Sequence, residues 1–347
     1  MQDIIIAIDA MGGDLGLEVT APAACAFLHR KRNRRYRILM IGDETQTESA
    51  LLAAGGQTLL ESERIMVRHA SEVVEMNELP ALALKRKKDS SMRVAINCVK
   101  EGAAHAAVSA GNTGALMATA RFVLKTVAGI ERPAICTTLP CIDPDQRVLV
   151  LDLGANVDSP PALLEQFAVM GMVLSNLSHG VDNPRVALLN VGVEDIKGSE
   201  KIKRAAEPIA ATKLNYCGFA EGDELFSGKF DVIVTDGFEG NIALKSSEGT
   251  AKMVMAVLKE EFLRSWFTRI IALLAKPVFK RMQGRLDPRS HNGASLLGLN
   301  GIVIKSHGGT DVTGFEFAIA EAALQAELGL VSRLSEGIER FISDQPD

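Results

Sequence analysis

The stretch "AAVSAGNTGAL", residues 106–116, puts a strand, a turn of small residues and the start of a helix in direct succession. Residues 106–109 are small or β-branched, as in a strand buried on both faces, and a helical pattern begins near Gly114. The turn "SAGNTG" leaves the backbone almost bare. Because the first N–H groups of a helix are unpaired and lie at the positive end of its dipole, this stretch predicts an anion site at the junction.

The same succession of strand, small-residue turn and helix recurs along the chain. Strands are predicted over residues 4–8, 36–41, 65–69, 106–109, 148–152, 186–190, 215–219, 232–235 and 301–305. Helices are predicted over 20–30, 91–101, 114–126, 162–177, 202–211 and 313–328. Alternation of this kind indicates an α/β fold, with a mostly parallel sheet sandwiched by helices. No internal repeat or low-complexity linker divides the chain, so residues 1–347 are interpreted as a single α/β/α domain.

Composition indicates an ordinary globular chain with a large core. The 347 residues are 47% hydrophobic and 23% charged, with a net charge of −5. The five cysteines include no C-x-x-C pair, which argues against a disulfide framework and a zinc site and favours a reducing compartment. Residues 4–8 begin a strand with no secretion signal before them, and no run approaches the ~20 apolar residues of a membrane span. We expect a cytoplasmic protein.

Six predicted strands end in turns rich in Gly, Asn, Asp and Lys, over residues 9–14, 109–114, 152–156, 190–198, 235–241 and 305–309. A single glycine after a strand is usually just a turn residue. In a parallel sheet, however, all six turns would open on one edge and line one cleft. The residues expected to bind an anionic substrate there are Asp9, Gly12, Gly13, Ser109, Gly111, Asn112, Thr113, Gly114, Asp152, Gly154, Asn156, Asp236 and Gly237.

Several well-known chemical signatures do not occur in the sequence. G-x-G-x-x-G and G-x-x-x-x-G-K-[ST] are missing, which removes the main support for a nicotinamide oxidoreductase or a P-loop ATPase. The sequence contains neither the G-x-S-x-G elbow of serine hydrolases nor an H-E-x-x-H helix. We therefore expect no cofactor and no metal.

Longer motifs resemble those of the phosphate acyltransferase family of bacterial phospholipid synthesis. They are "DAMGGD", "KRKKDSSMRVA", "SAGNTGALM", "GIERPA", "LDLGANVD", "NPRVALLN", "DGFEGNIALK" and "NGASLLGLNGIVIKSHG", and the resemblance runs from residue 4 to about residue 326. It implies transfer of a fatty acyl group from acyl-acyl carrier protein to inorganic phosphate. It also implies a fold similar to isopropylmalate dehydrogenases and phosphotransacetylases, a homodimer and peripheral membrane association. Glu239 departs from the family pattern, in which Thr is common, and adds negative charge near the expected site.

The implied product, an acyl phosphate, would serve a membrane glycerol-3-phosphate acyltransferase. Two alternatives remain open from the sequence. One is a phosphate acyltransferase that uses a coenzyme A thioester. The other is a non-catalytic scaffold that docks partners of lipid synthesis at the membrane.

Phosphate is itself a nucleophile, so its attack on a thioester needs positioning and oxyanion donors rather than a serine or cysteine. Backbone N–H groups, a few Asn and Thr side chains and one or two lysines suit this task. The expected catalytic residues are Lys197, Asn241, Lys305 and His307. Lys197 could equally be a solvated loop lysine, and His307 a structural group bonded to the backbone. The aspartates at the strand ends are expected to cap turns rather than act as bases.

Two clusters of basic residues are present. Six of the eight residues 30–37 are Lys or Arg, and the net charge of −5 favours a solvated turn over a surface for nucleic acid, which we do not expect as a partner. The second cluster, Lys85, Arg86, Lys87 and Lys88, precedes a helix-start signal at residues 89–91. Either cluster could steer the acidic carrier protein, and the second is favoured because the resemblance puts it near the active site.

Residues 252–285 combine an apolar stripe at helical spacing with eight Lys or Arg against two Glu. One interpretation is a helix packed in a dimer interface. The other is an amphipathic helix, or a helical pair broken before Pro277, at a membrane surface containing anionic lipid. The second interpretation assigns membrane contact to Trp266, Phe267, Ile270, Ile271 and Leu274.

Overall fold

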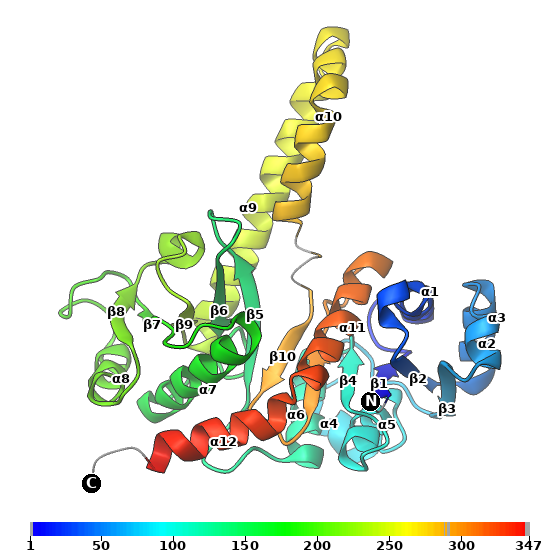
Figure 1. Cartoon of the computed structure of the whole chain (residues 1–347), viewed down its shortest axis with the longest axis horizontal. Helices are drawn as coiled ribbons and strands as arrows, with labels where there is room; N and C mark the ends of the chain where they lie inside the picture. Colours follow the sequence, from blue (N-terminus) through cyan, green and yellow to red (C-terminus); the bar gives the residue numbers. More distant parts are fainter. Residues whose placement is uncertain (1–2, 288, 290–291, 344–347) are drawn as a thin grey trace.

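The computed structural model describes residues 3–287, 289 and 292–343, which form an eleven-stranded sheet with helices on both faces (Figure 1). The strands are β1 (Ile4–Asp9), β2 (Tyr36–Gly42), β3 (Ile65–His69), β4 (Ala106–Ser109), β5 (Ala134–Pro140), β6 (Arg147–Leu151), β7 (Val186–Leu189), β8 (Tyr216–Ala220), β9 (Val232–Val234), β10 (Ala294–Leu297) and β11 (Ile302–Lys305). Their order across the sheet is β3-β2-β1-β4-β11-β10-β5-β6-β9-β7-β8. All nine predicted strands are present, and β5 and β10 were not predicted.

The helices are α1 (Leu17–His29), α2 (Glu44–Ala53), α3 (Gln57–Glu61), α4 (Pro80–Arg86), α5 (Ser91–Lys100), α6 (Thr113–Leu124), α7 (Pro161–His179), α8 (Glu200–Ala211), α9 (Gly237–Leu263), α10 (Trp266–Leu286), α11 (Val312–Glu327) and α12 (Leu330–Ser343). The 3-10 turns Lys31–Asn33 and Gly222–Phe226 also lie between these helices. The six predicted helices are present within a few residues of their expected bounds.

The sheet is mostly parallel, as predicted, but it consists of two halves that run in opposite directions. β5 pairs antiparallel with both β6 and β10, and β10 pairs antiparallel with β11. All the other strand pairs of the described sheet are parallel. The direction therefore reverses at the β10–β5–β6 junction, with β1 to β4 and β11 on one side and β6 to β9 on the other.

This reversal makes the expectation of one shared edge wrong. In the antiparallel register, Leu151 at the end of β6 lies opposite Cys136 near the start of β5, whereas Lys305 at the end of β11 lies opposite Ala294 at the start of β10. The turns at 9–14, 109–114 and 305–309 thus open on one edge, which we call the Lys305 edge. The turns at 152–156, 190–198 and 235–241 open on the opposite edge, which we call the Asp152 edge.

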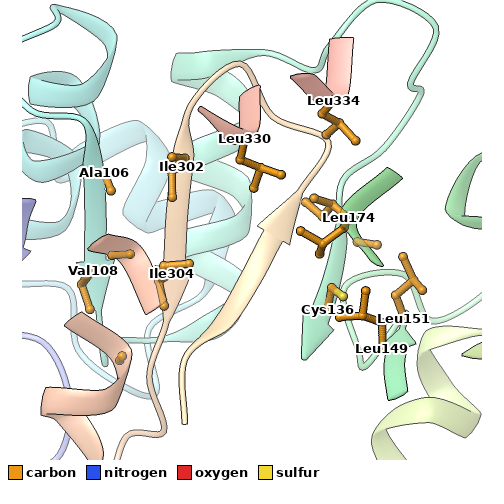
Figure 2. Packing of buried hydrophobic residues seen from close by; sticks show 14 of the residues in the cluster. Ala106, Val108, Cys136, Leu149, Leu151, Leu174, Ile302, Ile304, Leu330 and Leu334 are labelled. Atoms are coloured by element: carbon orange, nitrogen blue, oxygen red, sulfur yellow. The ribbon is translucent and has the colours of Figure 1, made fainter. Parts of the chain in front are cut away.

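The apolar core divides into two layers, one on each face of the sheet. One layer is formed with α1, α7, α11 and α12, and includes Phe167 and Phe315, both fully buried. Figure 2 shows part of this layer, where Leu330 and Leu334 of α12 lie beside strand residues such as Ile302. The other layer is formed with α4, α5 and α6 and includes Ile96 and Leu116. The three-layer α/β/α arrangement is therefore confirmed.

Helices α9 and α10 form a long antiparallel hairpin that extends away from the sheet (Figure 1). They contact each other through Phe262 and Phe279, whose ring centroids are 4.8 Å apart. The predicted break before Pro277 is wrong, because Pro277 lies inside α10. The chain instead breaks at Ser265, whose side chain accepts the N–H of Thr268 and caps α10. A capping residue can end one helix and begin another without a proline.

Candidate active site

The turn that follows β4 is built around the carboxylate of Asp9, at the end of the neighbouring strand β1. Asp9 is 1% exposed and accepts a hydrogen bond from Ser109 Oγ at 2.7 Å. Ser109 Oγ in turn accepts the N–H of Gly111 at 3.0 Å. A Cβ on Gly111 would lie 2.7 Å from the Met92 methyl group, and one on Gly12 would lie 3.0 Å from the Gly111 nitrogen. The small residues here let two turns pack closely around a buried carboxylate.

The open part of this turn is the N-terminus of α6. Asn112 caps the helix by accepting the N–H of Ala115 at 3.0 Å, and its Nδ2 donates to the carbonyls of Met76 and Glu78. Thr113 and Gly114, the first residues of α6, are exposed. Their N–H groups lie at the positive end of a 12-residue helix, so they are the donors that an anion could reach from solvent.

Asp152 organises the corresponding turn on the opposite edge. It is fully buried and accepts the N–H groups of Ile135, Ala155 and Asn156, together with Asn156 Nδ2 at 2.9 Å. Burial raises its pKa, although these hydrogen bonds oppose the shift. Gly154, at φ +122°, comes close to Asn241 of α9, because a Cβ there would be 3.4 Å from Asn241 Cβ. Asp152 is thus a structural anion that holds the turn closed.

Asp236 caps α9 and holds a lysine. Its carboxylate accepts the N–H of Phe238 at 2.9 Å and of Ser159 at 2.6 Å, and Lys201 Nζ lies 2.9 Å from it. Burial opposes ionisation, but the hydrogen bonds from Lys201, Ser159 and Phe238 together outweigh it and keep the pKa of Asp236 below its ordinary value. The neighbouring Gly237 is buried, and a Cβ on it would approach the Asn156 carbonyl oxygen to 2.3 Å. The aspartates at the strand ends therefore cap turns, as predicted.

Lys305, at the end of β11, is a buried cation. It is 9% exposed, and its Nζ donates to the carbonyl oxygens of Ala110, at 3.2 Å, and of Ser306. Burial lowers its pKa to about 8, although the negative charges of Asp9 and Asp14 oppose the shift. An ammonium kept inside a protein without a salt bridge costs stability, and such groups are typical of functional sites.

His307 has one ring nitrogen engaged and one open. Its Nδ1 accepts the N–H of Gly309 at 3.2 Å, so the neutral ring carries its proton on Nε2. Burial, and after it the positive charge of Lys245, lowers the pKa of His307, which keeps the ring neutral at pH 7. The backbone-bonded role considered from the sequence is thus observed for Nδ1, whereas Nε2 stays available as a donor.

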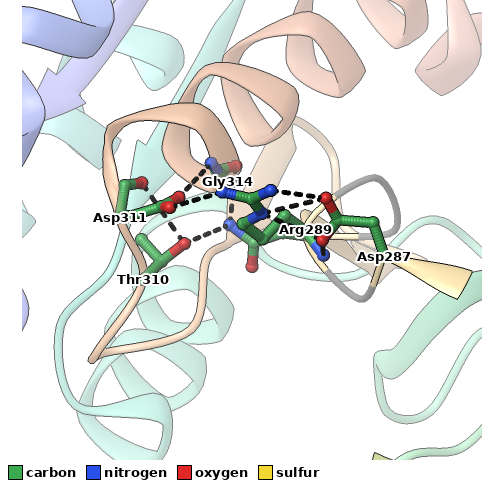
Figure 3. A network of polar contacts seen from close by, with 6 residues as sticks. Asp287, Arg289, Thr310, Asp311 and Gly314 are labelled. Carbon is green, nitrogen blue, oxygen red and sulfur yellow. Dashed lines mark hydrogen bonds and ion pairs between the residues drawn. The ribbon is translucent and has the colours of Figure 1, made fainter. Parts of the chain in front are cut away.

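A polar network fixes the turn that carries His307. Arg289 forms ion pairs with Asp287 and Asp311, each at 2.7 Å, and Asp311 caps α11 by accepting the N–H of Gly314 (Figure 3). Asn292 accepts the N–H of His307 through Oδ1 at 2.9 Å. The turn after β11 is therefore held from two directions, and the position of His307 is well defined.

Helix α9 spans the sheet between the two edges. It begins at Asp236 on the Asp152 edge, where Asn241 lies against Gly154, and runs towards the Lys305 edge, because Lys245 lies near His307 and Lys305. The charge of Lys245, two turns into α9, lowers the pKa values of both His307 and Lys305. Lys245 was not predicted as a site residue, because an exposed lysine inside a helix usually faces solvent. The one available signal was its position at the end of the motif "DGFEGNIALK".

The four expected catalytic residues do not all lie on one edge. Lys305 and His307 are on the Lys305 edge, whereas Lys197 and Asn241 follow β7 and β9 on the Asp152 edge. Lys197 is 47% exposed in a loop, and its Nζ lies 2.8 Å from Glu194, so it is paired as well as solvated. That hydrogen bond raises the pKa of Lys197. Asn241 is exposed on the first turn of α9.

The cluster at residues 85–88 ends α4, and the predicted helix start after it is confirmed by Ser90, which caps α5. Lys85, Arg86 and Lys88 are exposed, whereas Lys87 donates to the Val73 carbonyl at 2.8 Å. α4 begins beside α6, because a Cβ on Gly114 would lie 2.8 Å from Pro80. The cluster is therefore one short helix away from the open N-terminus of α6.

The proposed membrane residues are all exposed at the hairpin tip or close to it. Trp266 and Leu274 are the most exposed, at 74% and 76%. Phe267, Ile270 and Ile271 are also exposed. Within the part of the chain that the structure describes, no helix is both long and apolar enough to cross a membrane.

Known proteins resemble this chain in both fold and sequence. A phosphotransacetylase from Streptococcus pyogenes superposes with a TM-score of 0.63 over 94% of each chain, at 15% identity. The family model described as "Fatty acid synthesis protein" matches residues 4–333. A protein named "Phosphate acyltransferase" from Legionella pneumophila (strain Paris) is 51% identical over 344 residues, covering 99% of this chain and 98% of its own length. One of that name from Neisseria meningitidis serogroup C is 53% identical over 336 residues, covering 96% and 94%.

The fold is the α/β fold of phosphotransacetylases, and the protein is an acyltransferase. More narrowly, the chain belongs to the phosphate acyltransferase family. The resemblance noted in the sequence is therefore confirmed at the level of the family.

Proposed function

We propose that this protein transfers a fatty acyl group from acyl-acyl carrier protein to inorganic phosphate, and that the reaction takes place at the Lys305 edge. The observation that carries the proposal is the set of hydrogen-bond donors along this edge, one of them a lysine ammonium. Lys305, His307 Nε2 and the exposed start of α6 at Thr113 all lie there, while the buried carboxylate of Asp9 is engaged by Ser109. A phosphate dianion would meet these donors, and Asp14 is the exposed carboxylate that lies near the same turn, beside Gly308.

The proposed reaction needs no enzyme nucleophile. An oxygen of hydrogen phosphate forms a bond to the thioester carbonyl carbon, the C–S bond breaks, and the leaving thiolate takes the proton that the phosphate loses as the carrier protein is released. The N–H groups of Thr113 and Gly114 and the Lys305 ammonium would hold the phosphate. His307 Nε2–H would donate to the developing oxyanion, an interaction for which a single donor typically contributes about 3 to 4 kcal/mol.

Lys197 and Asn241 have a different place in the proposal. Both lie on the Asp152 edge, where Asn241 contacts the Gly154 turn. A direct role for them in the same reaction requires a substrate that reaches along the first turns of α9 towards Lys245. Glu239, on the first turn of α9, has its pKa raised by burial and by Asp236, which reduces the negative charge that it adds there.

The carrier protein is the acyl donor that we propose, with the coenzyme A thioester as the alternative. Lys85, Arg86 and Lys88 support it, because they present an exposed positive surface one helix away from the start of α6. Lys87 contributes less, since its ammonium is engaged by the Val73 carbonyl. Electrostatic steering of an acidic partner raises the association rate and weakens with salt.

We further propose that the hairpin tip contacts the inner face of the membrane, where the acyl phosphate would be passed to a glycerol-3-phosphate acyltransferase. Its apolar side chains stand beside Lys and Arg side chains, as in helices that lie at the surface of anionic lipid. A homodimer is also proposed. Its candidate surface is the flank of α9, where Met253 and Val257 are 61% and 53% exposed.

Release of free thiol by the purified chain tests the central proposal. With acyl-acyl carrier protein, we expect thiol release that depends strictly on inorganic phosphate, with one acyl phosphate formed per thiol. A parallel series with acyl-coenzyme A identifies the preferred donor. Thiol release that is independent of phosphate would indicate a thioesterase, and no release with either thioester would favour the non-catalytic scaffold.

A further inference from the structure

A cavity of 490 Å³ lies on the sheet face between α7 and α11, over the junction where the two halves of the sheet meet. Its floor is formed by β5, β6 and β10, and its walls by the two helices. Gly284 of α10 lies on the rim. The residues that matter most to its chemistry are Thr138, Arg147, His179, Asn292, Ser295, Ala320, Glu321 and Gln325.

One end of the cavity adjoins the turn that carries His307. Asn292 lines the cavity and donates through Nδ2 to Ser306 Oγ at 2.8 Å, while its Oδ1 accepts the N–H of His307. Arg147, on the rim, begins β6 opposite Pro140, the last residue of β5, and so lies on the Lys305 edge as well. The cavity therefore opens on the edge where the proposed chemistry takes place.

The wall of the cavity combines apolar surface with a chain of hydrogen-bonding groups that carries little charge. Ser295 Oγ donates to Gln325 Oε1 at 3.0 Å, and Gln325 Nε2 donates to Glu321 Oε1 at 2.7 Å. Burial raises the pKa of Glu321 and lowers that of His179, so both groups are shifted towards their neutral forms. Thr138 Oγ1 lies 3.5 Å from His179 Nε2.

Such a surface discriminates between possible occupants. A plain hydrocarbon chain would cover these polar groups without hydrogen-bonding to any of them, and His179 Nδ1, which has no hydrogen-bond partner among the described residues, would stay buried without one, which is unfavourable. A highly charged ligand would find one Lys or Arg in the lining that the structure describes, Arg147 at the rim. A flexible chain with amides, a hydroxyl and methyl groups matches both the polar and the apolar parts of the wall.

We propose that this cavity binds the phosphopantetheine arm that carries the acyl thioester, an inference that rests on the proposed function. The thioester end lies towards Asn292 and His307, and the amides contact Glu321 and Thr138. The phosphate end lies at Arg147 on the rim. Lys280 and Arg281 of α10 are exposed one turn before Gly284, on the side from which an acidic carrier protein would approach.

Binding measured without turnover tests the proposal separately from the reaction. Calorimetry with S-methyl phosphopantetheine, which has neither thiol nor thioester, should detect binding to the full chain. Ala320→Phe, which fills the cavity, should weaken binding about tenfold or more. Ala53→Phe, at an exposed position of α2, is the matched control and should bind normally. Arg147→Gln should weaken binding of the phosphorylated arm but not of S-methyl pantetheine.

Kinetics give the second measurement. Ala320→Phe should raise the KM for the thioester about tenfold and leave the KM for phosphate unchanged. Thr138→Val keeps the side-chain volume and should raise the KM for the thioester by a smaller factor. This variant serves as the test if Ala320→Phe does not fold. Equal affinity of the wild type and both cavity variants for the arm would overturn the proposal. So would binding of decanoic acid, but not of the arm, because the cavity would then be an acyl-chain site.

Discussion

Lys305→Met should make the protein more stable while impairing its use of phosphate. Lys305 is almost fully buried, and among the residues that the structure describes its Nζ donates to two carbonyl oxygens. Methionine is similar in length and apolar, so it fits the same space without a charge. Residues that are retained although they lower stability are typical of functional sites. Replacing such a residue raises the stability of the protein and lowers its activity.

The expected change in the free energy of unfolding follows from the lowered pKa of Lys305. A decrease in the pKa of Lys305 from 10.5 to about 8 corresponds to about 3 kcal/mol of destabilisation at pH 7. The substitution also leaves the carbonyls of Ala110 and Ser306 without their donor, which costs about 1 kcal/mol each. We therefore expect Lys305→Met to be about 1 kcal/mol more stable than the wild type at pH 7.

The pH dependence of the free energy of unfolding gives an independent test of the same reasoning. Between pH 8 and pH 10.5 the folded wild type has released the Lys305 proton and the unfolded chain still holds it. The unfolded state then binds more protons, so this lysine makes the free energy of unfolding rise with pH in that window. Lys305→Met should lack the rise.

Urea denaturation at pH 7 and pH 9.5 measures both quantities, and the KM for phosphate should increase in the same preparations. Our reasoning about burial fails if the variant is less stable than the wild type at pH 7 and keeps the same dependence on pH.

Three further predictions concern other parts of the molecule. Gly111→Val should lower the thermal stability, because a Cβ there would lie 2.7 Å from the Met92 methyl group and 3.4 Å from Asp9 Oδ2, which leaves little room for a branched side chain. Lys197→Ala should leave the KM for phosphate and the thermal unfolding unchanged, as should Lys203→Ala, which removes another ion pair, because Lys197 lies on the Asp152 edge and the proposed phosphate site on the Lys305 edge; a raised KM for phosphate in Lys197→Ala alone would bring Lys197 into the reaction. The double variant Ile271→Asp with Leu274→Asp should no longer sediment with anionic vesicles and should still turn over soluble substrate. If it instead loses the dimer or fails to fold, a second copy of the chain covers this surface.

The strands and helices could be predicted largely from local patterns. The strand at residues 65–69 and the one at 106–109 have the predicted bounds, because continuous runs of β-branched and small residues are typical of buried strands. β5 was missed because Thr137 and Thr138 interrupt its apolar pattern. β10 was missed because it has only four residues and begins with Ala294 and Ser295.

Those two missed strands explain the largest error about the site. The pairing direction of β5 and β10 decides that the two halves of the sheet run in opposite directions, and hence which strand ends share an edge. The capping role of Asp152 was predictable, because an aspartate followed by small residues at a strand end is a local signal. The approach of Lys245 to His307 depends on how α9 crosses the sheet, which no local pattern encodes.

The reversal also explains why a cavity exists where it does. In open α/β sheets, ligands bind where the winding of the chain changes, because helices that cover neighbouring strands diverge there. Here α7 covers the strands on one side of the reversal and α11 those on the other, and β10 and β5 lie between them with the cavity above. Polar residues such as Thr138 and Ser295 line that cavity, and the same residues interrupt the apolar pattern by which these strands could have been predicted from the sequence. The features that made the strands hard to recognise are therefore the ones that give the cavity its hydrogen-bonding groups.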